Sequence, residues 1–147
     1  MNNYIYIMNN LESVYHDIYL KVNDIIVSYD LNIYKEMLLE EITSNNNLIQ
    51  LKNKKNTDSI LLYIIKLCYI KSNKKITKSM CLDIINKKNN DYGNSYKDFG
   101  YVGILIRIID KINRLKNLSN IDKYNINETY FDTLLDLHNY CVLSFII

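Results

Sequence analysis

The sequence predicts an all-α domain with one helix buried at its centre. Along most of the chain, apolar residues recur at i, i+3, i+4 and i+7, which is the spacing of an amphipathic helix. No segment shows the sustained alternation of apolar and polar residues that a half-buried strand requires. The segment Asp98–Arg114 is apolar on nearly every side, so other helices must cover it. These observations predict a helical bundle around a central helix at about residues 98–115.

Helical spacing in the first third of the chain predicts two helices and one short turn. The first helix is expected at Leu11–Tyr29, where the apolar stripe persists over five turns. A shorter helix is expected at Ile33–Ile42. Leu48–Leu51 is interpreted as a single helical turn within a loop rich in asparagine and lysine. Each of these segments has one apolar side to bury.

Capping and loop residues divide the rest of the chain. Thr57 is expected to cap a helix that continues to Ile70, because its hydroxyl can accept a hydrogen bond from a free N–H of the first turn. Thr77 is expected to cap a shorter helix. Asn89–Ser95 contains the aspartate, glycine and asparagine typical of a loop, and Asn127 can cap the last helix. The chain therefore predicts about seven helices.

Length and charge indicate one domain that does not bind nucleic acid by electrostatics. A chain of 147 residues can bury a full core, so residues 1–147 are interpreted as a single domain. The formal net charge is only +2, whereas nucleic-acid binders usually carry a marked basic excess. No apolar run reaches the roughly 20 residues of a membrane span, and the first residues do not resemble a signal peptide. No transmembrane anchor is expected.

The cysteines and histidines offer no recognisable catalytic or metal site. Cys68, Cys81 and Cys141 lie among apolar residues without zinc-type spacing, so we expect buried free thiols in a reducing compartment. His16 is interpreted as a structural residue at or near the surface. His138 is three residues before Cys141, but one helix supplies only two of the four ligands of a closed zinc site. A core histidine is the favoured interpretation.

The carboxylates are sparse as well. Asp132 and Asp136 are four residues apart on what is expected to be an exposed face, but the Glu-x-x-His pairs of a bundle di-metal site are missing. No phosphate-binding loop motif is present either. From the sequence we expect no metal, no cofactor and no enzymatic activity.

Two glycines distinguish the predicted central helix. Gly100 and Gly103 lie on nearly one face, and each costs about 1 kcal/mol of helix stability relative to alanine. Either they allow a neighbouring helix backbone to approach closely, or they make room for a partner helix in a groove. Arg107 follows one turn later. Its side chain either reaches solvent or offers a charge to an incoming acidic residue.

The segment from Phe99-Gly100-Tyr101-Val102-Gly103-Ile104-Leu105 to Ile108-Ile109-Asp110 resembles the central helix of the Bcl-2 fold. It is most similar to that helix in the poxviral Bcl-2-like proteins, and Leu11–Tyr29 is similar to the first helix of that family. A composition rich in residues with A/T-rich codons agrees with a large DNA virus. The resemblance implies a partner-binding groove formed by Tyr63, Phe99, Gly100, Gly103, Ile104 and Arg107.

The sequence departs from that family at the groove. Apoptosis-blocking members place an arginine directly after the glycine, where it pairs with an aspartate of a bound Bcl-homology-3 helix. This chain has Ile104 at that position, and Arg107, three residues later, is hypothesised to replace the arginine. The C-terminal membrane anchor of many apoptosis blockers is also not expected here, because the Tyr140–Ile147 run is too short to span a bilayer. Both departures favour the branch that inhibits innate signalling.

Three functions are therefore considered from the sequence. The first is a non-enzymatic viral protein of the host cytoplasm that binds signalling adaptors or kinases, with homodimerisation as an option, and lowers NF-κB or interferon induction. The second is an apoptosis inhibitor that captures pro-apoptotic Bcl-homology-3 helices in its groove. The third belongs to another class: an unrelated all-α structural bundle, or an enzyme with an unrecognised site. An internal polar site around His138 would favour the third.

Overall fold

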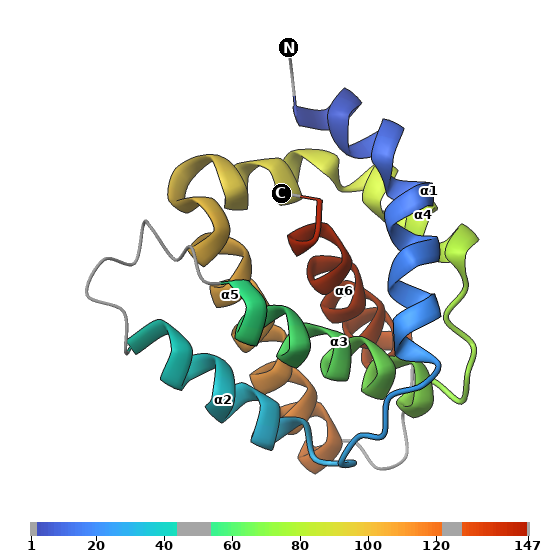
Figure 1. The fold of residues 1–147 in the computed structure, drawn as a ribbon. Helices are drawn as coiled ribbons and strands as arrows, with labels where there is room; N and C mark the ends of the chain where they lie inside the picture. Colours follow the sequence, from blue (N-terminus) through green and yellow to red (C-terminus); the bar gives the residue numbers. More distant parts are fainter. Residues whose placement is uncertain (1–2, 44–53, 122–127, 147) are drawn as a thin grey trace.

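The chain folds into six α helices in the part that the structure describes. The computed structural model describes the backbone of residues 3–43, 54–121 and 128–146, and the side chains within residues 10–43, 57–88, 100–118 and 129–146. The helices are α1 (Asn3–Val22), α2 (Leu31–Thr43), α3 (Lys54–Lys71), α4 (Lys78–Lys87), α5 (Asn89–Ile121) and α6 (Glu128–Ser144) (Figure 1).

The predicted all-α class is confirmed over these residues, which contain no strand. Six helices are described, where the sequence predicted about seven. The helical turn expected at Leu48–Leu51 and the cap expected at Asn127 lie outside the described residues.

The innermost helix is α6. It packs against α1, α3, α4 and α5, and Figure 1 shows it running between them. From Thr133 to Ser144 every side chain of α6 except that of Asp136 is buried, including those of Leu134, Leu137, Cys141, Val142 and Leu143. The sequence had assigned the central position to the 98–115 segment, but Ile106 and Arg107 of α5 face solvent. That arrangement follows from the polar residues on one side of α5, whereas α6 has few polar positions to expose.

The first helix ends earlier than its apolar stripe predicted. Beyond Val22, the N–H groups of Asp24 and Ile25 donate to carbonyls three residues earlier, which closes the helix with a tight turn. The next residues include two β-branched isoleucines, which have lower helix propensity than straight-chain residues. Asp30 then begins α2 by accepting a hydrogen bond from the N–H of Asn32 at 2.9 Å. The predicted helix at Leu11–Tyr29 is therefore correct only as far as Val22.

The two threonine caps have different outcomes. Thr77 caps α4 as predicted, because its Oγ1 accepts a hydrogen bond from the N–H of Met80 at 3.2 Å. Thr57 does not cap α3, since that helix begins at Lys54 and places Thr57 inside it. The Thr57 side chain is fully buried, and its hydroxyl has no hydrogen-bond partner among the described residues. A threonine near the start of a helix can thus match the sequence pattern of an N-cap and still lie inside the helix.

A break at Gly100 divides α5 into two helical parts. Gly100 has φ 63° and ψ −144°, whereas the sequence predicted a loop at Asn89–Ser95 and a regular helix from Asp98. A Cβ added at Gly100 would meet no atom within 4 Å, so no neighbouring backbone requires a glycine there. Of the two interpretations given for Gly100, the close approach of a neighbouring helix backbone is therefore excluded. The glycine is needed because side-chain-bearing residues rarely adopt this backbone conformation.

Replacing Gly100 by alanine should lower the free energy of unfolding by about 1–3 kcal/mol, the usual cost of a residue held in a sparsely populated backbone region. In a regular helix the same substitution would instead raise stability by about 1 kcal/mol. Urea unfolding of the wild type and the G100A variant measures the sign of the change. An increase in stability would contradict the break at Gly100.

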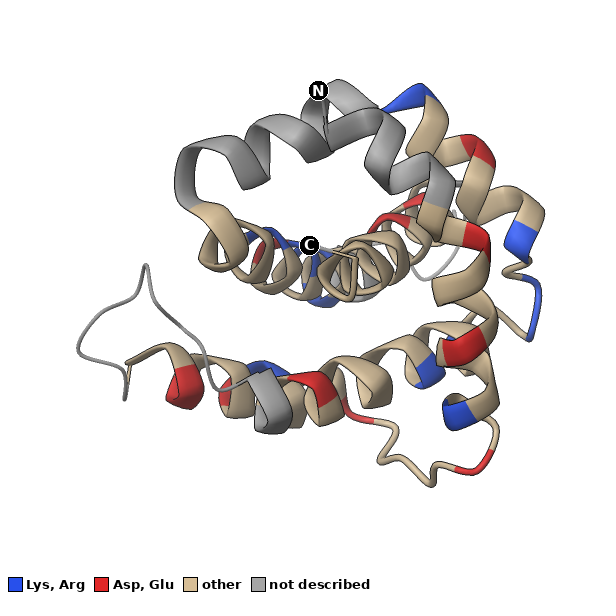
Figure 2. Ribbon diagram, turned by 45° about the horizontal axis from the view of Figure 1, so that its top comes forward, with Lys and Arg blue, Asp and Glu red and all other residues tan. Residues whose placement is uncertain are grey.

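The distribution of charged and apolar residues agrees with the composition of the sequence. In the view of Figure 2, Lys and Arg positions are interspersed with Asp and Glu positions along the described helices. This distribution agrees with the small net charge. None of the described helices combines the length and apolar content that crossing a membrane requires. The three cysteines are buried free thiols, as predicted.

Candidate functional site: a polar cluster joining α4, α5 and α6

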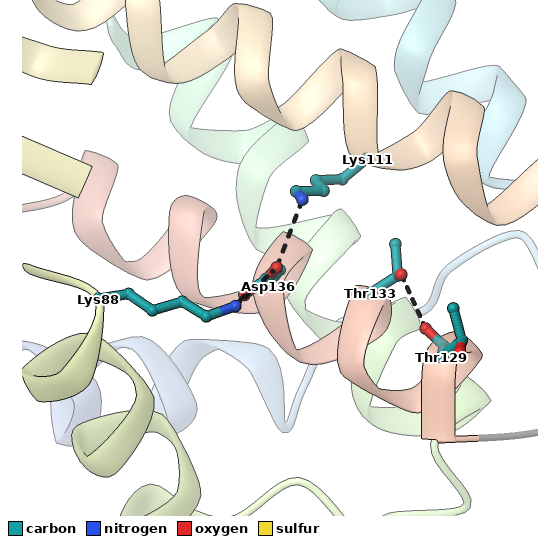
Figure 3. A network of polar contacts seen from close by, with 5 residues as sticks. All are labelled: Lys88, Lys111, Thr129, Thr133 and Asp136. Carbon is teal, nitrogen blue, oxygen red and sulfur yellow. Dashed lines mark hydrogen bonds and ion pairs between the residues drawn. The ribbon is translucent and has the colours of Figure 1, made fainter. Parts of the chain in front are cut away.

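A partly buried aspartate on α6 binds Lys111 of α5 and Lys88, the residue that follows α4. Asp136 accepts hydrogen bonds from Lys88 Nζ at 3.1 Å to Oδ1 and 3.3 Å to Oδ2. Lys111 Nζ lies 3.4 Å from Oδ2 of the same carboxylate (Figure 3). The side chain of Asp136 is only 14% exposed, while those of Lys88 and Lys111 are 43% and 26% exposed. We call these three residues the Asp136 cluster.

The Asp136 cluster lies where helix geometry brings polar stripes together. Lys88 directly follows α4, and its N–H donates to the carbonyl of Ile84, which places the side chain at the end of that helix. On α5, Lys111 shares one face with Arg107, Asp110 and Arg114, because residues at i, i+3, i+4 and i+7 are neighbours on a helix. On α6, Asp136 shares a face with three polar residues by the same rule: Thr129, Asp132 and Thr133.

The contact between Lys111 and Asp136 shows that the two stripes meet along the α5–α6 pair. Together with Lys88, they contribute four cations and three carboxylates, a surplus of one positive charge. Thr133 does not extend towards the lysines, since its hydroxyl donates to the carbonyl of Thr129 at 2.8 Å (Figure 3). The edge of α5 and α6 is therefore a mixed-charge surface with a basic surplus.

A second group of polar residues lies inside the bundle on the same helix. His138 is completely buried, and its Nε2 lies 2.5 Å from the hydroxyl of Tyr19 on α1. Its Nδ1 lies 3.0 Å from Oδ1 of Asn139. The ring of Tyr19 stacks on Tyr15, with 4.6 Å between centroids, and meets Tyr69 edge to face. We call His138, Tyr19 and Asn139 the buried network.

Hydrogen-bond chemistry fixes the proton positions of the buried network. An amide oxygen can only accept, so Nδ1 of His138 donates to Asn139 and Nε2 accepts from the hydroxyl of Tyr19. Burial lowers the pKa of His138 to about 4, although the bond to Asn139 opposes the shift. Burial also raises the pKa of Tyr15 to about 12 and that of Tyr19 well above its ordinary value. The network is therefore neutral near pH 7.

The buried network connects α6 to α1 but leaves one polar group unsatisfied. Nδ2 of Asn139 has no hydrogen-bond partner among the described residues, although it is fully buried. His138 is thus a core histidine, as predicted, while His16 lies exposed on α1. No group of three or more His, Cys, Asp or Glu side chains in the described part of the chain is placed to hold a metal ion.

The residues predicted to form a groove occupy different environments. Ile104 is fully buried, Gly103 is buried and Arg107 is exposed one turn further along α5. Tyr63 lies half-buried on α3, where its ring is 5.5 Å from that of Tyr34 on α2. The backbone of Gly100 forms the break in α5, and the side chain of Phe99 lies outside the described residues.

The sequence analysis did not single out the Asp136 cluster. It interpreted Asp136 as part of an exposed carboxylate pair, but the side chain is mostly covered. A signal was available: Asp136 stands among apolar residues of the last helix, and Lys111 follows the apolar run of the preceding one. Opposite charges on two neighbouring apolar helices are most easily accommodated beside each other. Lys88 could not be added from the sequence, because the packing of α4 determines its position.

One comparison with known proteins concerns the C-terminal segment that carries this cluster. Residues 88–147 match the family model described as nucleotide modification associated domain 1. The match begins at Lys88 and includes Lys111 and Asp136. Neither a curated protein nor a solved structure matches the chain.

Proposed function

We propose that the chain is a helical nucleotide-binding domain that acts in nucleotide modification, with the Asp136 cluster as the site for nucleotide phosphates. The observation that carries the proposal is that the family match and the cluster lie in the same part of the chain. The segment similar to a nucleotide modification associated domain, residues 88–147, contains all three residues of the Asp136 cluster: Lys88 after α4, Lys111 on α5 and Asp136 on α6.

The chemistry of the cluster suits a phosphate. Lysine ammonium groups bind phosphate oxygens as compact charges, and Lys88 and Lys111 are already held within 4 Å of one carboxylate. Both lysines retain exposed surface, so a phosphate can approach them from outside. Arg107 and Arg114, on the same face of α5, add two further cations along the edge. Asp136 positions the lysine side chains before the ligand arrives.

The mixed charges also limit what can bind. The four cations of the edge attract a compact anion. Because Asp110 and Asp132 lie among them, the edge does not form the continuous basic stripe of a nucleic-acid binder. This agrees with the small net charge of the chain. A free nucleotide fits this description better than a polynucleotide does.

The proposal is tested by calorimetric titration of the wild type with nucleoside triphosphates. Lys88→Met and Lys111→Met should each weaken the binding about tenfold, since hydrogen bonds to charged groups contribute roughly 1.5–3 kcal/mol. Lys78→Met is the matched control, because Lys78 is also paired with a carboxylate, Glu12, but lies at the other end of α4. Equal affinity in the wild type and both cluster variants would contradict the proposal.

The Bcl-2 resemblance gives a second proposal: a non-enzymatic viral protein that inhibits host innate signalling or captures pro-apoptotic helices. Ile106 and Arg107 favour it. They lie side by side on the exposed part of α5, next to buried Gly103 and Ile104. An apolar residue beside a cation suits an amphipathic helix that carries an acidic residue. Titration with Bcl-homology-3 peptides tests the apoptosis branch, and binding assays with host signalling adaptors test the other.

A further inference from the structure

A pocket of about 320 Å³ lies between four helices of the bundle. Its walls come from the start of α2, the end of α3, the second half of α5 and the start of α6. None of Lys88, Lys111 and Asp136 lines it. The volume is at the lower end of the range of about 300–1,000 Å³ typical of small-molecule sites.

The pocket and the Asp136 cluster use different residues of α5. Successive residues of an α helix are rotated by about 100°. Relative to Lys111 of the cluster, the pocket residues Ile112, Asn113, Leu115 and Lys116 are therefore rotated by about 100°, 200°, 40° and 140°. Three of these four residues point about 100° or more away from Lys111, so the pocket lies mainly on another face of α5. The pocket is a separate site, and its occupancy does not depend on the proposed function.

The pocket is lined by apolar and aromatic side chains together with two lysines. Leu31, Ile112 and Leu115 are buried and form its apolar surface. Tyr29 and Tyr130 contribute aromatic rings. Such rings favour a planar ligand, because aromatic pairs stack face to face with an offset or meet edge to face.

Charge determines the second property of the ligand. Lys71 and Lys116 line the pocket, and among the lining residues that the structure describes Asp30 is the one carboxylate. Asp30 accepts the hydrogen bond of the Asn32 N–H and so caps α2. The positive end of the α2 dipole points to the same place. Lys71 Nζ lies 6.0 Å from the centroid of the Tyr29 ring, so a cation and an aromatic surface are adjacent on one wall.

We propose that this pocket binds a small planar anion, a ring that carries a phosphate or carboxylate group, with the ring against Tyr29 and Tyr130 and the anionic group at Lys71 and Lys116. Two sources share this chemistry: a nucleoside monophosphate and an aromatic carboxylic acid. Asn32 and Asn113 supply donors and acceptors for the polar edge of the ring.

Calorimetric titration of the full chain with adenosine 5′-monophosphate and with 4-hydroxybenzoate tests the proposal and distinguishes the two sources. Adenosine and inorganic phosphate are the matched half-ligands. At least one planar anion should bind about tenfold more tightly than either half-ligand. Failure of both planar anions to bind would overturn the proposal.

Variants locate the binding. Changing Lys71→Met and Lys116→Met together should weaken it at least about tenfold, and so should Tyr29→Leu, whose side chain is 68% exposed and thus dispensable for folding. Lys111→Met should leave it unchanged, because Lys111 belongs to the Asp136 cluster. Circular dichroism melting confirms that each variant is folded. Binding that survives in the pocket variants, or that is lost in Lys111→Met, would place the ligand elsewhere and overturn the proposal.

Discussion

Replacing Leu137 by alanine should lower the free energy of unfolding by about 3–5 kcal/mol, a large effect for a single substitution. Leu137 is fully buried on α6, the innermost helix. Its truncation loses the free energy gained by burying the removed methyl groups, and it leaves a cavity that the four surrounding helices cannot easily close. A domain of this size has a total stability of about 5–15 kcal/mol, so the variant should approach the limit of folding. Urea unfolding followed by far-ultraviolet circular dichroism measures the change.

The matched control is an apolar residue on α5. Ile106→Ala removes a side chain that is 46% exposed and should change the free energy of unfolding by less than about 1 kcal/mol. If the two substitutions had similar effects, α6 would not be the centre of the bundle. An Ile106 variant more damaging than the Leu137 variant would restore the arrangement that the sequence predicted.

The second large effect is a loss of stability in mild acid that depends on His138. Burial lowers the pKa of His138 to about 4 in the folded protein, against 6.5 for the ordinary group. The unfolded chain therefore takes up a proton more readily than the folded one, and stability falls as the pH drops from about 6.5 to about 4. The difference of about 2.5 pKa units corresponds to about 3 kcal/mol. Below pH 4 this histidine contributes no further loss.

Urea unfolding of the wild type and of His138→Gln at several pH values between 7 and 4 isolates this effect. Glutamine can still accept the hydrogen bond of Tyr19 but does not titrate, so the variant should lose less stability across that interval. His16→Gln should behave as the wild type, because His16 lies exposed on α1. Parallel pH profiles for the wild type and His138→Gln would show that His138 is not held neutral by burial.

The sequence was sufficient for the helical class because the apolar spacing of most helices is long and regular. It predicted the cap at Thr77 correctly and placed α2 at Ile33–Ile42, within two residues of its observed limits Leu31–Thr43, since both depend on local residues. It extended the first helix past Val22, because an apolar stripe records which side is buried and not where hydrogen bonding stops. It also gave Gly100 a packing role, since the sequence contains no information about the sign of φ.

The candidate site was harder to predict than the fold. Lys88, Lys111 and Asp136 are separated by more than twenty residues in sequence and meet only through the packing of α4, α5 and α6. Paired side chains on different helices have no fixed spacing, so no motif reveals them. The buried network has the same origin: Tyr19 and His138 are 119 positions apart, and the sequence identified His138 as a core residue but not its partner.

The most direct test is to locate bound nucleotide by nuclear magnetic resonance, with a nucleoside triphosphate added to isotopically labelled protein. We expect the largest chemical-shift changes at Lys88, Lys111 and Asp136, and their loss in the Lys111→Met variant but not in Lys78→Met. Shifts confined to other surfaces, or no shifts at nucleotide concentrations in the millimolar range, would contradict the assignment of the Asp136 cluster as a nucleotide site.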